Sequence, residues 1–135
     1  MGQKVNPIGL RVGISKTWNS KWYAGKDYPE QLKQDLSIQK FVKKRLKHAA
    51  ISHIEVERTA KKTKVNIFTA RPGIIIGRKG DEVERLKHEL NKLTRHEVIV
   101  NIKEIKRPEI EATLVAENIA NQRSEERRVG KECER

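Results

Sequence analysis

Apolar residues alternate with polar ones in three short stretches of the chain. The stretches cover residues 52–59, 64–69 and 98–105, and an alternation of this kind predicts half-buried strands. The first two are separated only by the polar residues 60–62, which predicts a hairpin-like pair. The alternating apolar residues are Ile54, Val56, Val65, Ile67, Val98, Val100 and Ile102.

Apolar residues spaced three and four apart predict three helices between and around these strands. The first begins near Asp27, a suitable N-cap residue, and extends to about Ala50; the second follows Gly80, and the third opens at Pro108. The first two are expected to bury Leu32, Leu36, Phe41, Val42, Leu46, Ala49, Val83, Leu86, Leu90 and Leu93. Helices and strands in this order predict a small α+β domain built of packed layers.

A short glycine-containing turn joins the second strand to the second helix. Within residues 71–82, Pro72 suits the first turn of a short helix, and residues 77–80 then place a glycine at each end of a turn with Arg78 and Lys79 between. Glycines allow a sharp turn and the close approach of another backbone. The turn therefore suits a polyanion, whose phosphates would meet the two cations.

These glycines also admit other interpretations. The turn could be a plain corner between helices with solvated cations. A nucleotide-binding P-loop is disfavoured because Lys79 is followed by Gly80 rather than by Ser or Thr. The dinucleotide-binding fingerprint fails as well, since Gly73 and Gly77 are four residues apart.

Residues 1–37 form a basic and aromatic amino-terminal arm that includes the start of the first helix. Glycines and spaced cations are followed by Trp18, Trp22 and Tyr23. Such an arm suits RNA, because cations meet phosphates while rings stack on exposed bases. The alternative is that the rings pin the arm to the folded domain, and both interpretations stay open.

Composition narrows the class of partner. Of 135 residues, 30 are Lys or Arg and 18 are Asp or Glu, which gives a net charge of +12 and a sequence pI near 10.0, as expected of a nucleic-acid binder. No helix pairs a cationic face with Trp or Phe, which disfavours a membrane-surface role.

With one cysteine, Cys133, a disulfide framework is excluded. Lacking a signal segment or a long apolar run, the chain is expected to be cytoplasmic.

The histidines give no sign of catalysis or of metal binding. The four of them, His48, His53, His88 and His96, show neither ligand spacing nor a nucleophile at hand. We therefore expect no enzyme, no metal, no cofactor and no small-molecule substrate.

Longer motifs give a specific family resemblance. Residues 1–7, 9–14 and 18–23 resemble the amino terminus of the bacterial small-subunit ribosomal protein family number three, and residues 69–80 are similar to its KH domain, a fold whose Gly-x-x-Gly loop clamps about four nucleotides. The resemblance extends to about Gln122.

The resemblance implies a specific architecture and setting. A type II KH domain with a three-stranded sheet backed by helices would occupy residues 38–107, and a helix over 108–122 would lead to a carboxy-terminal domain that this chain lacks. The implied partners are small-subunit ribosomal RNA, mRNA and neighbouring ribosomal proteins of the subunit head. The implied role is structural, in the cytoplasmic small subunit near the mRNA path, and includes helping to position mRNA.

The candidate RNA-binding residues fall into two groups. Those of the glycine turn are Arg71, Ile74, Gly77, Arg78, Lys79 and Gly80; those of the arm are Lys4, Arg11, Lys16, Lys21 and Trp22. The alternative function is a free-standing KH module that binds single-stranded mRNA or regulatory RNA. The arm argues against it, because a solitary KH domain needs no such extension.

Residues 123–135 differ from the rest of the chain. After Gln122, charged residues replace the regularly spaced apolar residues. Residues 123–133 look like the in-frame translation of a common sequencing-library adapter. We expect 123–135 to be a non-native tail. The alternative is a genuine tail whose charge pairs prolong the helix.

Overall fold

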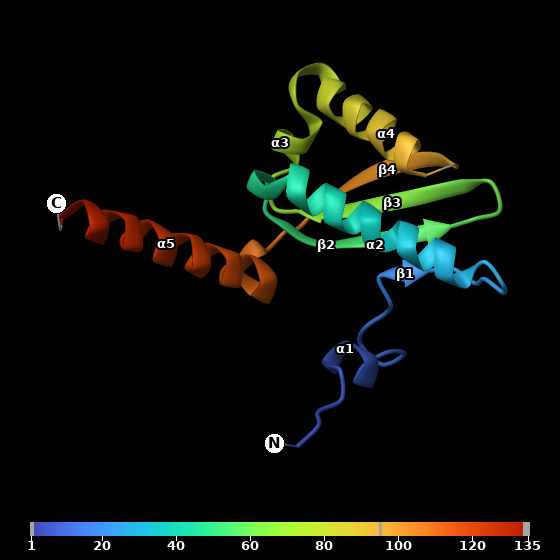
Figure 1. The fold of residues 1–135 in the computed structure, drawn as a ribbon, viewed down its shortest axis with the longest axis horizontal. Coiled ribbons are helices and arrows are strands. Elements are labelled where there is room, and N and C mark those ends of the chain that lie inside the picture. Colours follow the sequence, from blue (N-terminus) through green and yellow to red (C-terminus); the bar gives the residue numbers. More distant parts are fainter. Residues whose placement is uncertain (1, 95, 134–135) are drawn as a thin grey trace.

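The computed structural model describes residues 2–94 and 96–133, and from α2 onward its elements follow the order predicted from the sequence (Figure 1). The helices are α1 (Pro7–Leu10), α2 (Tyr28–Arg45), α3 (Pro72–Ile76), α4 (Asp81–Leu93) and α5 (Ala112–Cys133), with 3-10 turns η1 (Lys47–Ala49), η2 (Arg78–Gly80) and η3 (Pro108–Ile110). The strands are β1 (Ser20–Lys21), β2 (Ile51–Arg58), β3 (Lys62–Thr69) and β4 (Glu97–Glu104).

The strands form one mixed sheet in the order β1-β2-β3-β4. β2 and β3 pair antiparallel, which confirms the predicted hairpin, while β3 and β4 pair parallel. A parallel pair needs a crossover connection, and α3 and α4 supply it. The expectation of three strands is corrected to four, because Ser20 of the arm pairs in parallel with Val56. A strand of two residues is too short to show a period in the sequence.

Helices α2 and α4 lie over one face of the sheet and enclose the core (Figure 1). Ile38 and Val42 of α2 and Leu86 of α4 are buried there against the strand residues Val56 and Ile67. Each side chain of this size contributes about 1.5–3 kcal/mol when it is fully buried. The core therefore holds the turn between α3 and α4 at a fixed place beside the sheet.

Two details of the helices differ from the prediction. Leu36 of α2 and Leu93 of α4 are 48% and 47% exposed, whereas Asp35 is buried on the inner face of α2. The first helix also ends earlier than expected, since α2 stops at Arg45 and the chain turns through η1 to Ala50, which has a left-handed φ of 51°. A slightly different helical phase, centred on Ile38 and Val42, accounts for the exposure of Leu36.

Helix α5 projects away from the sheet (Figure 1). Within 112–127 only Leu114 is buried, and Ile119 is 60% exposed. The helix runs through Gln122 without a break. The backbone thus shows no boundary where the resemblance ends, and the non-native origin of 123–135 stays a prediction.

Candidate nucleic-acid interface

The backbone of the glycine turn needs both of its glycines. Gly77 has φ 68° and ψ −168°, a region that is essentially restricted to glycine. A Cβ at this position would lie 2.7 Å from Cγ of Glu82. Gly80 has φ 83° and precedes α4 as its N-cap, and Lys79 between them is also left-handed at φ 58°. The sequence therefore produces a tight, bare turn just before a helix.

The two cations of the turn extend into solvent. Arg78 and Lys79 are both exposed, and within the described part of the chain neither enters a hydrogen bond of its side chain or an ion pair. The nearest acids in sequence are Asp81 and Glu82, and Glu82 lies 3.8 Å from a guanidinium nitrogen of Arg45 on α2 and 3.6 Å from one of Arg85. These contacts offset the charge of Glu82.

The three isoleucines before the turn differ in their exposure to solvent. Ile75 is 1% exposed and anchors α3 in the core, whereas Ile74 is 47% and Ile76 43% exposed. An apolar surface thus borders the glycine turn. Arg71 is exposed at the N-cap of α3, and its backbone N–H donates to the buried hydroxyl of Thr69 at 3.1 Å.

The arm cations lie in a second region of the molecule. Lys4, Arg11 and Lys16 are exposed, and Lys21 pairs with Glu55 at 3.3 Å. Since the arm pairs through β1 with β2 while the glycine turn belongs to the crossover between β3 and β4, the two groups lie at different ends of the domain (Figure 1). The structure gathers the predicted residues into two separate surfaces.

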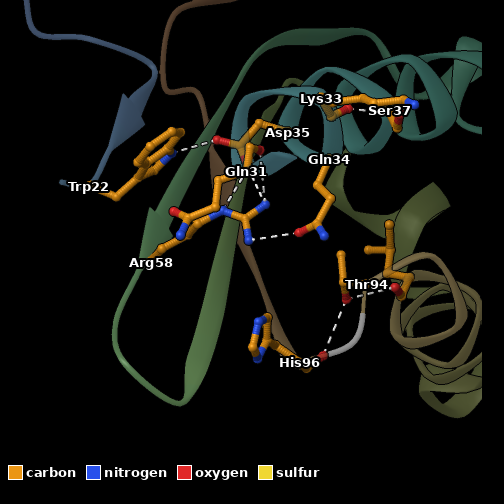
Figure 2. A network of polar contacts seen from close by, with 10 residues as sticks. Trp22, Gln31, Lys33, Gln34, Asp35, Ser37, Arg58, Thr94 and His96 are labelled. Atoms are coloured by element: carbon orange, nitrogen blue, oxygen red, sulfur yellow. Dashed lines mark hydrogen bonds and ion pairs between the residues drawn. The ribbon is translucent and has the colours of Figure 1, made fainter. Parts of the chain in front are cut away.

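Trp22 is fixed to the domain by a buried polar network (Figure 2). Its indole N–H donates to Oδ2 of Asp35 at 2.6 Å, and Nε of Arg58 donates to Oδ1 of the same carboxylate at 2.8 Å. The Asp35 and Arg58 side chains are 1% and 7% exposed, and Arg58 also donates to Gln34 at 3.1 Å. The pinning interpretation therefore holds for the edge of this ring, while the stacking of an RNA base on its face stays a prediction.

Sequence reasoning missed Asp35 and Arg58. Asp35 lies on the same face of α2 as Ile38 and Val42. A carboxylate at helical spacing from buried apolar residues could therefore have indicated a buried polar contact. No comparable signal points to Arg58, since its partner is 23 residues away. The effect of the network is to hold the end of the arm against α2 and β2.

A second missed group lies across the other face of the sheet. Cross-strand register places His53, Phe68 and Lys103 in one row. The rings of His53 and Phe68 stack with centroids 4.1 Å apart, and Nζ of Lys103 is 5.1 Å from the Phe68 centroid. Burial lowers the pKa of His53 below its ordinary value, although Glu55 and Glu111 act in the opposite direction.

No metal-binding cluster of three or more His, Cys, Asp or Glu side chains occurs within residues 2–94 and 96–133. The helices of the described chain include none with the length and apolar character needed to cross a bilayer.

Comparison with known protein families matches residues 37–110 to the KH domain. The chain belongs to the KH domain family. The match covers more than half of the chain and includes β2, β3, β4, the glycine turn and the second half of α2. The α+β fold with a helix-backed sheet agrees with this assignment.

The chain is also similar to curated proteins over most of its length. It is 63% identical over 122 residues to "Small ribosomal subunit protein uS3" of Geobacter sp. (strain M21) and 64% identical over 122 residues to the protein of that name in Geotalea uraniireducens (strain Rf4). Each alignment covers 90% of this chain and 58% of the relative. With the protein of the same name in Syntrophus aciditrophicus (strain SB), the identity is 59% over 136 residues, covering 98% of this chain and 63% of the relative. The chain thus spans about three fifths of the length of these relatives.

Proposed function

We propose that the chain is an RNA-binding, structural component of the small ribosomal subunit, acting in the cytoplasm and not as an enzyme. The observation that carries the proposal is the identity of 63–64% over 122 residues to proteins named "Small ribosomal subunit protein uS3". Its ligand would be ribosomal RNA of the subunit head, with neighbouring head proteins as partners. A place near the mRNA path, where the chain helps to position mRNA, belongs to the same proposal.

The glycine turn would bind the sugar-phosphate backbone. KH domains clamp about four nucleotides with the Gly-x-x-Gly loop. At Gly80 an added Cβ would meet open space, so a phosphate could approach the backbone there, while Gly77 allows the backbone to turn and Arg78 and Lys79 would neutralise phosphate charge. The half-exposed Ile74 would supply an apolar floor on which a base rests.

The arm would bind RNA independently of the turn. Residues 2–26 contain no acidic residue. No carboxylate of this segment therefore competes with RNA phosphates for Lys4, Arg11 and Lys16. Lys21 would contribute less, because it already pairs with Glu55. Two separated positive surfaces suit a large folded RNA better than a short single strand, which favours a ribosomal role over the free-standing KH module.

A charge-reversal experiment tests the role of the turn. Replacing Arg78→Asp together with Lys79→Asp should leave the melting temperature unchanged, since both side chains are exposed. Affinity for single-stranded RNA should fall, and the log–log salt slope should become shallower by about 0.7 for each phosphate that the turn no longer neutralises. The matched control is Lys61→Asp with Lys64→Asp near the opposite end of β3, two exposed lysines outside the glycine turn. An equal loss of affinity in both double variants would show a general charge effect and refute a specific role of the glycine turn.

Assembly distinguishes the ribosomal role from the free-standing module. The proposal expects the chain to co-sediment with small subunits after a high-salt wash, in competition with the full-length relative. Binding to single-stranded mRNA with no retention on subunits would favour the free-standing KH module.

A further inference from the structure

An aromatic pocket lies between the arm and the first part of α2. Its volume is about 490 Å³, within the range of about 300–1,000 Å³ typical of small-ligand sites. Trp18, Trp22 and Tyr28 contribute rings to its wall, together with the apolar side chains of Ile8 and Leu32. None of these residues belongs to the glycine turn, so the pocket is distinct from the KH loop.

One wall of the pocket is anchored by a contact made outside it. The indole N–H of Trp22 is bound to Asp35, and its ring lies 5.4 Å from that of Tyr28, tilted by 50°. The two rings therefore form a corner of the pocket in which Trp22 is the anchored side. Trp18 packs beside Gly9, where an added Cβ would lie 3.8 Å from its ring, and it remains 56% exposed.

Polar groups at the rim match the edge of a nucleobase. Asn6, Asn19 and Ser20 line the pocket beside the rings. Oδ1 of Asn6 accepts from the N–H of Ile8 at 2.9 Å as the N-cap of α1, which leaves the amide nitrogen of Asn6 to donate to a ligand. Side-chain amides and hydroxyls next to aromatic faces are the combination with which proteins stack and hydrogen-bond unpaired bases.

The surrounding charge selects among possible ligands. Residues 2–26 of the arm carry Lys4, Arg11, Lys16, Lys21 and Lys26 and no acid, so an aromatic group attached to a phosphate backbone is favoured over an apolar peptide. We infer that this pocket binds one unstacked nucleobase of single-stranded or looped RNA, while the arm cations hold the flanking phosphates. The inference rests on the proposed RNA-binding function and adds to it a base-binding site outside the KH loop.

The two tryptophans, the only ones in the chain, supply the readout. The whole chain is titrated with oligoadenylate and with an abasic oligoribonucleotide of the same length and charge. Because a stacked base quenches indole emission, we expect saturable quenching and tighter binding with oligoadenylate. Trp18→Ala should weaken oligoadenylate binding by about fivefold to hundredfold, which corresponds to about 1–3 kcal/mol per stacked base, and leave binding of the abasic strand unchanged. Trp18→Phe should retain most of the affinity.

A matched aromatic control lies five residues away in sequence. Tyr23 is 96% exposed and does not line the pocket, so Tyr23→Ala should change the affinity less than twofold, about 0.4 kcal/mol at most. In the Trp18→Ala protein the emission of Trp22, anchored on Asp35, reports that the domain is folded.

Several results would overturn the inference. Equal affinity of the wild type for the two strands, or an equal loss of affinity in Trp18→Ala and Tyr23→Ala, would exclude the base pocket while leaving the proposed RNA-binding function intact. Emission that changes with protein concentration in the absence of RNA would show that a second copy of the chain fills the pocket. Failure of the wild type to bind either strand would exclude the base pocket, and only a loss of co-sedimentation with small subunits as well would overturn the proposed function.

Discussion

Substituting Gly77 tests most directly how the fold builds the glycine turn. At φ 68° and ψ −168°, any side chain strains the backbone by about 1–3 kcal/mol. The new Cβ would also lie 2.7 Å from Cγ and 3.0 Å from Cβ of Glu82, an overlap that belongs to the class of overpacking costing about 1–3 kcal/mol. For Gly77→Ala we expect the free energy of unfolding to fall by about 2–5 kcal/mol, the sum of these two costs with some relaxation of Glu82.

Gly80 provides the matched control within the same turn. Its φ of 83° is left-handed, but an added Cβ would meet no atom within 4 Å. Gly80→Ala should therefore cost only the left-handed strain of about 1–2 kcal/mol. In thermal unfolding followed by circular dichroism, each kcal/mol lowers the melting temperature by about 4–8 °C for a domain of this size class, so the two variants are readily separated.

A second substitution isolates the contact with Glu82. Alanine at position 82 has no Cγ, so combining Glu82→Ala with Gly77→Ala should recover part of the stability, with a coupling free energy of about 0.5–3 kcal/mol. Equal melting temperatures for Gly77→Ala and Gly80→Ala, together with no coupling to Glu82, would refute this explanation of the turn.

Four further outcomes are expected. Asp35→Ala should cost about 3–5 kcal/mol in urea unfolding, because it leaves the Arg58 guanidinium buried without its partner; a cost below about 1 kcal/mol, the level of a surface ion pair, would contradict the burial of the network. Deleting residues 1–26 removes β1 and the indole donor to Asp35, so the melting temperature of the remaining domain should fall, and an unchanged value would show that the arm orders only on RNA. The lowered pKa of His53 means that the unfolded chain takes up this proton first on acidification, so the urea midpoint should decline as the pH falls through about 6.5, and His53→Gln should remove that part of the decline. Truncation after Gln122 should leave the core transition unchanged, because the described side chains beyond it are exposed; long-read sequencing of the gene would show whether the frame continues into a second domain or stops.

The repeating parts of the fold were predictable because each has a period. β2, β3 and β4 alternate, and the predicted ranges agree with the observed bounds within one or two residues. Helix α4 was equally clear, since Leu86 and Leu90 recur at helical spacing and are buried. For the turn, glycine and proline specify local backbone geometry, so its form could be inferred without knowledge of tertiary contacts.

What the sequence could not reveal depends on contacts between distant segments. β1 is a strand only because Val56 lies beside it. In the sequence, Trp22 cannot be distinguished from a ring that faces RNA. Only the fold identifies it as an anchor, because the fold brings Asp35 and Arg58 together beside it. For the same reason the pocket beside Trp18 could not be inferred from the spacing of the aromatic residues.

The network around Asp35 also determines when the arm can become attached during synthesis. Residues 2–26 emerge first and carry five cations and no acid, yet the complete network needs Arg58. At about 5–20 residues per second, the 36 residues that separate Trp22 from Arg58 take about 2–7 seconds to make. For that interval the nascent arm is a tethered polycation without its anchor, exposed to any nearby nucleic acid. The anchor cannot form before Arg58 of β2 has been made, so the arm stays unattached for at least this interval.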